Sequence, residues 1–157
     1  MKTITTLISF IFIVNFSVAQ PGTLDSSFGV DGKVVNYGFG DLFCSALQKD
    51  GKIIAAGQSN PDDVLMLVRY NNDGSLDSTF GDNGKLLTDM EPKYQFFYTG
   101  AHDVAIQEDG KIIIVGDGYR DIGDYGDYDI LLVRYNPNGT LDSSFGDNGV
   151  VIDDFYD

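Results

Sequence analysis

Three short segments recur almost unchanged along this chain, and this repetition constrains the fold more than any other feature. They read LDSSFG, LDSTFG and LDSSFG, at residues 24–29, 76–81 and 141–146. The sequences between them also match, because QKDGKIIAAG is followed later by QEDGKIIIVG, and LVRYNNDG by LVRYNPNG. A period of roughly fifty to sixty residues is typical of repeat proteins, whose units bury their apolar surfaces against one another. We therefore expect stacked repeats within one domain.

Each repeat contains short runs that are typical of β-strands. Asp50-Gly51 and Asp109-Gly110 lie between such runs, and an Asp-Gly pair strongly indicates a hairpin because Gly readily adopts positive φ. Residues 64–68 and 130–133 are apolar throughout, as expected of strands covered on both faces. The expected strands are residues 33–37, 43–48, 52–57 and 63–70 in the first unit, residues 85–88, 103–107, 111–116 and 128–135 in the second, and residues 149–153 in a third.

Polar loops at residues 72–84 and 137–149, dense in Asn, Asp and Gly, connect the units. Leu76 and Phe80 interrupt the first loop, and we expect these apolar side chains to anchor it on a neighbouring sheet. Asp77 lies between them and is expected to accept hydrogen bonds from backbone N–H groups of the turn.

Basic side chains flank the predicted strands at matching places in the two units. Arg69 and Arg134 each follow an apolar strand and precede Tyr. We expect each Arg to pair with an Asp of the adjoining loop or to stack on Tyr. Lys52 and Lys111 are expected to face solvent at the start of a strand.

Taken in order, GTLDSSFG, QKDGKIIAAG and LVRYNNDGSLDSTFG resemble the delta-60 repeat, a bacterial repeat predicted to form β-propeller blades. The resemblance covers nearly all of residues 22–157. It implies an all-β fold of β-propeller-like, four-stranded antiparallel blades, and it implies export or display at the cell surface. The family has no assigned reaction, so the resemblance implies no catalytic residue.

The number of repeats departs from that of a complete propeller. A first unit spans about residues 22–74, a second about residues 75–139, and one strand of a third lies within residues 140–157. Propellers typically close with about four to eight blades, so two full units form an incomplete ring. Three explanations are open: a fragment or truncated reading frame with missing blades, which we favour because repeats need about three units for stability, a homo-oligomeric ring, or a two-sheet sandwich.

Residues 1–19 read as a secretory signal peptide. Lys2 provides a positive charge, residues 7–14 form an apolar run too short to span a bilayer as a helix, and residues 17–19 are small. An uncleaved anchor helix is the alternative interpretation. We expect the protein to be secreted or held at the cell surface, without membrane insertion after cleavage.

The chain carries 10 Lys and Arg against 24 Asp and Glu, a net charge of −14. This balance argues against nucleic acid and anionic lipid as partners, because binding phosphate requires clusters of Lys and Arg. The single cysteine, Cys44, leaves no internal disulfide, and we expect it to fill apolar space in a strand. A catalytic pair of Cys44 with His102 is the alternative for this residue.

Calcium is the one cofactor that the sequence suggests, and otherwise we expect none. Asp73, Asp77 and Asp82 lie in a loop crowded with carboxylates and amides, which are ligands of hard cations. Asp117 and Asp121, in the sequence DGYRD, faintly resemble the calcium loops of FG-GAP propellers. Asn, Asp and Gly are also ordinary turn residues, and no stretch matches the EF-hand pattern.

A second acidic and aromatic loop belongs to the second unit alone. An insertion between residues 116 and 129 adds Asp and Tyr to a stretch rich in Gly. Aromatic faces stack on sugars and carboxylates accept hydrogen bonds, so this loop is a candidate for ligand binding. A solvated loop kept open by glycine is the alternative. The ligand candidates are Tyr119, Asp124, Tyr125 and Tyr128.

These features together favour a non-catalytic, exported scaffold that binds extracellular protein or glycan through its loops. The sequence contains no Ser-His-Asp set, histidine cluster, phosphate-binding glycine loop or nucleic-acid motif. The alternative is a fragment of a propeller-type polysaccharide hydrolase or lyase, which would use two loop carboxylates at a defined separation. The many Asp residues give no basis for choosing two, and loss of activity on replacing Asp121 or Asp124 would favour the enzyme.

Overall fold

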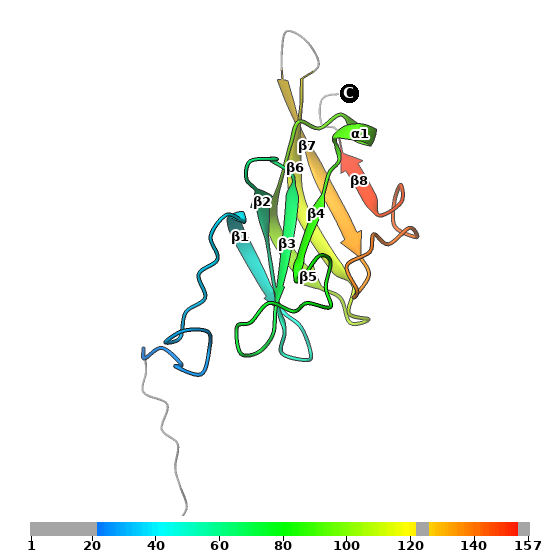
Figure 1. The fold of residues 1–157 in the computed structure, drawn as a ribbon. Coiled ribbons are helices and arrows are strands. Elements are labelled where there is room, and N and C mark those ends of the chain that lie inside the picture. Colours follow the sequence, from blue (N-terminus) through cyan, green and yellow to red (C-terminus); the bar gives the residue numbers. More distant parts are fainter. Residues whose placement is uncertain (1–21, 122–125, 154–157) are drawn as a thin grey trace, which may run out of the picture.

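The structure is a computed structural model that describes residues 22–121 and 126–153 (Figure 1). Apart from the helical turn α1 (Glu91–Tyr94), its regular elements are strands, which form two antiparallel four-stranded sheets. The first sheet contains, in order, β1 (Gly40–Leu47), β2 (Ile53–Ser59), β3 (Leu65–Tyr70) and β4 (Lys85–Thr88). The second contains β5 (Tyr98–Ile106), β6 (Ile112–Asp121), β7 (Gly126–Tyr135) and β8 (Val150–Asp153). The predicted all-β fold of four-stranded antiparallel blades is confirmed.

A tight hairpin begins each sheet. Gly51 has a φ of 86° and Gly110 a φ of 84°, a backbone conformation that favours glycine because a β-carbon would clash there. Gly51 N donates to Gln48 O at 2.9 Å, and Gly110 N donates to Gln107 O at 3.0 Å. The two Asp-Gly hairpins predicted from the sequence are therefore present.

The fourth strand of each sheet follows the LDSTFG or second LDSSFG segment. β4 pairs with β3, with Leu86 opposite Leu67, and β8 pairs with β7 in the same way. This corrects the expectation that residues 85–88 begin the second unit and residues 149–153 a third. The polar loop turns the chain back onto the preceding sheet, where the unpaired backbone groups of β3 or β7 take up the returning strand.

Residues 33–37 were expected to form a strand, and that prediction was wrong. Lys33 makes isolated bridges to Gly29 and Val30, and no strand includes residues 33–37. This segment holds the same place in its repeat as β4, but the described chain has no earlier sheet whose edge it could join. Tyr37 is accordingly 90% exposed.

The two sheets pack face to face around one main apolar core. β3 is buried along its whole length, as its continuous apolar sequence predicted. The same prediction for residues 130–133 of β7 was wrong, because Ile130 is 39% exposed. Leu65 and Leu67 lie in the main core together with residues of β5, β6 and β7, whereas Met66 and Val68 lie in a smaller cluster on the other face. Side chains alternate between the faces of a strand, so burial of β3 requires a cover on each side. Phe39, from the segment before β1, helps to cover the face of β3 that points away from the main core.

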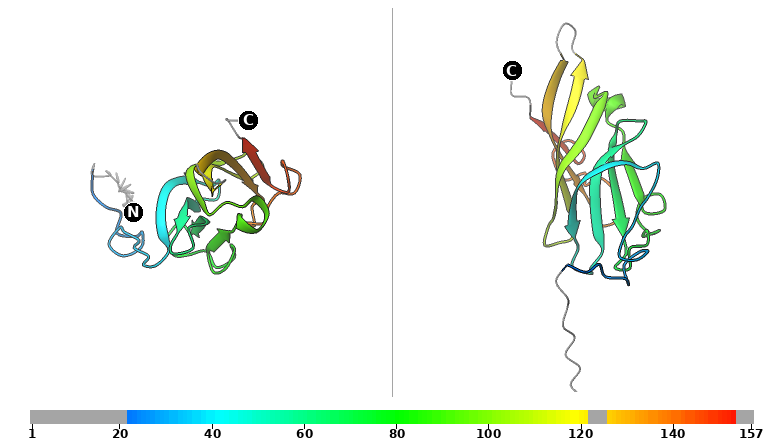
Figure 2. Two further views of the ribbon diagram at one scale, coloured as in Figure 1. Left: turned by 90° about the horizontal axis from the view of Figure 1, so that it is seen from above. Right: turned by 90° about the vertical axis from the view of Figure 1, so that its left-hand side faces the viewer.

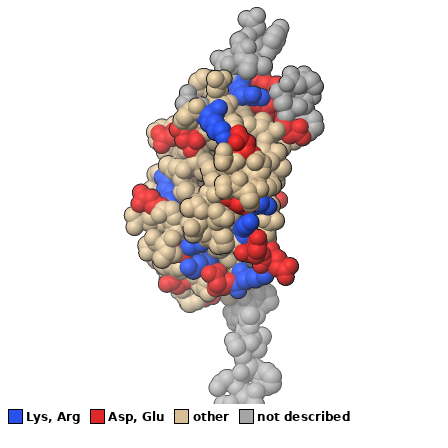
Figure 3. Space-filling view, turned by 90° about the vertical axis from the view of Figure 1, so that its right-hand side faces the viewer, with Lys and Arg blue, Asp and Glu red and all other residues tan. Residues whose placement is uncertain are grey.

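The segment before β1 and the strand β8 lie on opposite sides of the molecule (Figure 1 and Figure 2). Figure 3 shows the side that carries β8, where Lys and Arg atoms lie next to Asp and Glu atoms toward both ends and most of the surface between them is uncharged. Within the described residues, no helix is long and apolar enough to cross a membrane. The expected signal peptide, residues 1–19, lies outside them.

Candidate functional site

A buried carboxylate organises the loop that follows β3. Asp77 Oδ2 accepts hydrogen bonds from Arg69 Nε and Lys52 Nζ, each at 2.7 Å. Its Oδ1 accepts from Thr79 N at 3.0 Å and from Thr79 Oγ1 at 2.7 Å. The guanidinium of Arg69 lies 4.4 Å from the ring centre of Phe80. The predicted Asp–Arg pair and Asp cap are present, but Arg69 stacks on Phe instead of Tyr, and Lys52 pairs with Asp77.

The loop that follows β7 repeats this arrangement. Asp142 Oδ2 accepts from Arg134 Nε at 2.7 Å and forms an ion pair with Lys111 Nζ at 3.0 Å. Asp142 Oδ1 accepts from Ser144 N at 3.1 Å and from Ser144 Oγ at 2.7 Å. The guanidinium of Arg134 lies 4.4 Å from the ring centre of Phe145. The network is therefore a property of the repeat.

Both carboxyls have a pKa well below the usual range. Burial of Asp77 favours its neutral form, but the hydrogen bond from Lys52 and the other contacts described above outweigh this and lower its pKa. The pKa of Asp142 is lowered most by the hydrogen bond from Ser144, and next by that from Lys111. Both carboxylates are ionised and paired with cations on the protein itself, so this network stabilises the loop.

Among the described residues, the calcium candidates do not converge on one site, and each has its own hydrogen-bond partners or exposure to solvent. Among the residues described, no three carboxylate, imidazole or thiol groups are placed to hold one metal ion. Asp73 Oδ1 accepts from Ser75 N at 2.9 Å and from Ser75 Oγ at 2.7 Å, and Asp82 is exposed. Asp77 is paired with its two cations, and the side chain of Asp121 lies outside the described residues. Calcium binding stays a prediction.

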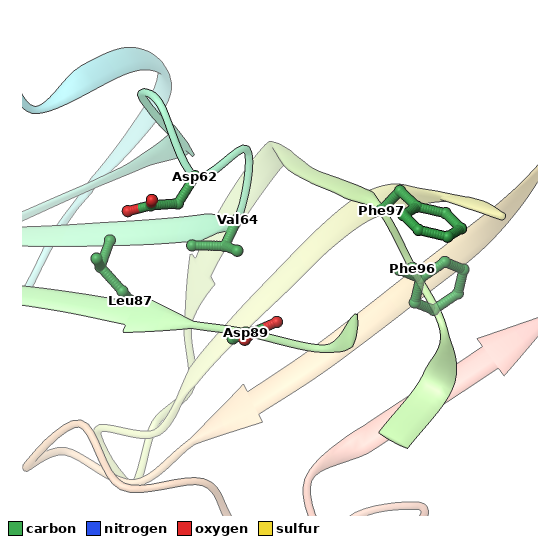
Figure 4. A pocket seen from close by; sticks show the side chains of 6 residues that line it. All are labelled: Asp62, Val64, Leu87, Asp89, Phe96 and Phe97. Carbon is green, nitrogen blue, oxygen red and sulfur yellow. The ribbon is translucent and has the colours of Figure 1, made fainter. Parts of the chain in front are cut away.

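A pocket of about 410 Å³ opens between the first sheet and the segment that leads into β5 (Figure 4). Its side chains come from the β2–β3 connection, from the end of β4 and from the residues just before β5. Phe96 is buried against Gly118, where a β-carbon would come within 2.6 Å of the Phe96 ring. Phe97 is 60% exposed and leaves an aromatic surface open to solvent. The lining residues are Asp62, Val64, Leu87, Asp89, Phe96 and Phe97.

Three tyrosines form a cluster that adjoins this pocket. The ring centres of Tyr119 and Tyr128 lie 5.1 Å apart, and those of Tyr98 and Tyr128 lie 6.5 Å apart. Phe97 N donates to Tyr119 O at 3.0 Å, which joins the pocket wall to the cluster. Burial raises the pKa of Tyr98, and the negative charge of Asp117 adds to this effect. Carboxylates and aromatic rings therefore gather at one end of the two sheets.

The structure places part of the predicted ligand loop in this cluster. Tyr119 and Tyr128 come together, while Asp124 and Tyr125 lie outside the described residues. Sequence reasoning proposed no ligand residue in the connection between the sheets, which contains α1 and carries an insertion relative to the first unit. Three consecutive aromatic residues in and next to that insertion were the signal that could have found it. The missed residues are Phe96, Phe97 and Tyr98.

The cysteine and the histidine have separate partners. His102 Nε2 lies 2.8 Å from Asp117 Oδ1, and Cys44 Sγ donates to Ala56 O at 3.6 Å. Burial raises the pKa of the Cys44 thiol, and Asp103 adds to this effect. A raised pKa disfavours the thiolate that nucleophilic chemistry requires, and the apolar neighbours of Cys44 fit the expected filling of space in a strand.

Comparison with known proteins agrees with this architecture. A family model described as "Domain of unknown function (DUF5122) beta-propeller" matches residues 48–80 and 107–145. These segments run from the turn before β2 into the loop after β3, and from the turn before β6 into the loop after β7. No curated protein matches the chain, and no solved structure does. The chain is thus built from repeats similar to those of a β-propeller family, folded as two four-stranded blades.

Proposed function

We propose that this protein is an exported, non-catalytic module that binds a neutral glycan at the pocket and the adjoining tyrosines. The observation that carries the proposal is the exposed ring of Phe97 in a pocket that Asp62 and Asp89 also line. The repeats themselves resemble a propeller family of unknown function, so the side chains at this end of the blades are what support glycan binding.

The chemistry of a sugar matches these side chains. The C–H face of a pyranose packs on an open aromatic ring, and its hydroxyl groups donate hydrogen bonds to carboxylates. Phe97 and Tyr128 offer exposed rings, at 60% and 59% exposure. The net charge of −14 repels acidic polysaccharides, which favours a neutral ligand.

Calorimetric titration with a panel of neutral oligosaccharides tests the proposal. We expect the Phe97→Ala and Tyr128→Ala substitutions each to weaken binding by about tenfold or more, as loss of an aromatic contact of about 1.4 kcal/mol would do. Tyr37→Ala is the matched control, because Tyr37 is also exposed but lies in the segment before β1. Equal effects of all three substitutions, or binding that none of them weakens, would contradict the proposed site.

Turnover distinguishes this proposal from the hydrolase or lyase alternative. We expect polysaccharides to remain intact after incubation with the protein, as measured by release of reducing ends. Release that is abolished by Asp62→Asn or Asp89→Asn would support the enzyme. Addition of calcium or a chelator during the titrations tests whether the predicted cation contributes to glycan binding.

Export is a separate element of the proposal and has its own test. It rests on the signal-like sequence of residues 1–19. N-terminal sequencing of protein recovered from the medium or the cell surface is expected to begin at Gln20. Retention of Met1 in the recovered protein would support the anchor-helix alternative.

A further inference from the structure

The two sides of each sheet have different roles in the packing. The side of the first sheet that faces the second, here called its front face, contains Ile54, Ala56, Leu65 and Leu67, all fully buried. The side of the second sheet that meets it, here called its back face, contains Ile112, Ile114, Leu131, Val133 and Tyr135. The contact therefore joins the front face of one blade to the back face of the next, and the two surfaces are unlike.

The front face of the second sheet is open. Val115 and Ile130 are 40% and 39% exposed, whereas their counterparts in the first sheet, Ala56 and Leu65, are fully buried. This face has the same apolar character as the front face buried inside the molecule. Its residues are Ile113, Val115, Ile130 and Leu132.

The back face of the first sheet lies at the other end of the stack. The segment before β1 covers part of it through Val34 and Phe39. Leu47, on the same face as its cross-strand partner Ile53, remains 69% exposed, although its counterpart Ile106 packs against the main core. This back face contains Ile53, Ala55, Met66, Val68 and Tyr70.

One hydrogen bond shows how the segment before β1 occupies this back face. Tyr135 OH on the second sheet lies 2.7 Å from Thr88 Oγ1, at the end of β4. On the first sheet, Asn36 Nδ2 donates to Tyr70 OH, also at 2.7 Å. Asn36 holds the same place in its repeat as Thr88. Residues 33–36 therefore take the place that the fourth strand of a preceding blade would take.

We infer that a second copy of this chain docks head to tail, with the back face of its first sheet on the front face of the second sheet. The contact already present between the two sheets supplies the template, because repeat counterparts form both surfaces. The open faces lie on opposite sides of the molecule, as the segment before β1 and β8 do (Figure 2). Unlike surfaces that meet head to tail generate a ring when the rotation closes.

The template also specifies polar contacts between the copies. Arg69 Nη1 donates to Pro137 O at 2.8 Å across the two sheets. The counterpart of this bond joins Arg134 to the carbonyl oxygen of Asn72 in the second copy. Phe145, the counterpart of the fully buried Phe80, becomes buried by the same contact.

Docking requires an exchange at the position of the fourth strand. Residues 33–36 of the second copy and β8 of the first are repeat counterparts, so both cannot occupy it. β8 is held by backbone pairing to β7 over its whole length, whereas residues 33–36 belong to no strand. The segment before β1 is therefore the one that is displaced. While it still occupies this position, it competes with the docking of another copy.

Sedimentation velocity over about 1–100 μM protein, the range of moderate affinities, tests the docking. We expect assemblies of about four to eight blades in total, the sizes at which propellers close. Val115→Asp, on the open front face, and Leu47→Asp, on the open back face, are each expected to weaken association by at least about tenfold, because each buries an unpaired carboxylate. Phe97→Asp adds the same charge outside both faces and is expected to leave association unchanged.

Mixing the two blocked variants gives the sharpest result. The Leu47→Asp copy keeps its front face and the Val115→Asp copy keeps its back face, so an equimolar mixture is expected to form a one-to-one dimer that grows no further. Formation of that dimer also shows that both variants are folded. Failure of the mixture to associate while each variant retains the circular dichroism and cooperative melting of the unmodified chain would overturn the proposal.

Deletion of residues 22–37 tests the exchange directly. Removing a segment that occupies the docking position is expected to tighten association by about tenfold, because an occupied site lowers the apparent affinity by its free fraction. Weaker association after this deletion would contradict the exchange. A parent chain that stays monomeric at all concentrations would overturn the docking and would point to blades from another polypeptide as the occupant of these faces. Neither result depends on glycan binding.

Discussion

The loop after β3 and the loop after β7 make the same contacts, but a neighbouring blade encloses only the first. In both loops an Arg Nε donates to an Asp Oδ2 at 2.7 Å and the guanidinium lies 4.4 Å from a Phe ring centre. Phe80 is fully buried, and Arg69 also donates to Pro137 O in the next repeat. Phe145 has no blade beyond it in the described structure and is half-buried. The repeat thus encodes the network, and the next repeat decides how deeply it is buried.

The largest expected difference between the loops is in the cost of removing their Phe rings. Phe80→Ala leaves a cavity between two blades and is expected to lower the free energy of unfolding by about 3–5 kcal/mol. Phe145→Ala removes a ring that already contacts water, and about 1–2 kcal/mol is expected. Urea unfolding followed by circular dichroism measures both. Equal losses would show that the second sheet does not enclose Phe80 in solution.

A smaller difference is expected for the carboxylates. Asp77→Asn keeps the size of the side chain but leaves Arg69, which is buried, and Lys52 without a negative partner. Breaking such a pair is expected to cost about 3 kcal/mol. Asp142→Asn is expected to cost less, because its partner Arg134 is more exposed to water than Arg69. A larger loss for Asp142→Asn would reverse the comparison.

Acidification tests the same carboxylates without substitution. Because their folded pKa values are lowered, the stabilisation is complete above the ordinary Asp pKa of about 3.9 and is lost as the pH falls toward the folded values. Relief of repulsion between the many acidic groups acts in the opposite direction. This relief of repulsion is nearly the same in the unmodified chain and in the Asp77→Asn variant. We therefore compare the urea unfolding of the two proteins between about pH 5 and pH 2. The variant is expected to lose less stability on acidification, and an equal loss in both would contradict the assignment.

The smallest expected effect concerns the two tyrosine hydroxyls. Tyr135→Phe removes a bond to Thr88 in β4 and is expected to cost about 1 kcal/mol. Tyr70→Phe removes a bond to Asn36, which belongs to no strand, and about 0.5 kcal/mol is expected. Thermal unfolding of the two variants measures both costs. A greater cost for Tyr70→Phe would mean that the segment before β1 is held as firmly as β4.

Sequence reasoning recovered the local structure of the repeats but assigned some strands to the wrong sheet. Gly51 and Gly110 mark the hairpins, because an Asp-Gly turn is determined by neighbouring residues. Residues 85–88 read equally well as the first strand of a unit or as the last. A periodic sequence does not show where one repeat ends and the next begins. Only the pairing of β4 with β3 shows that residues 85–88 form the last strand of the first sheet. Residues 33–37 have a similar sequence, but the described residues include no earlier sheet edge with which they could pair, so they form no strand.

The candidate site was less predictable than the fold. Tyr119 and Tyr128 were found because their insertion interrupts the repeat. Phe97 and Tyr98 were missed because their neighbours in the site lie far away in the sequence, on the β2–β3 connection and on β6. A pocket formed by segments from two blades depends on how the blades are placed, which periodicity does not describe.

The sequence by itself determined the repeat, its hairpins and the Asp–Arg network, because each depends on contacts within one unit. Tertiary structure decided which sheet each fourth strand completes, which of two equivalent Phe rings is buried, and where aromatic and acidic side chains meet. These outcomes differ between units whose repeated motifs are nearly identical in sequence, because backbone pairing and burial depend on the neighbour that each unit finds.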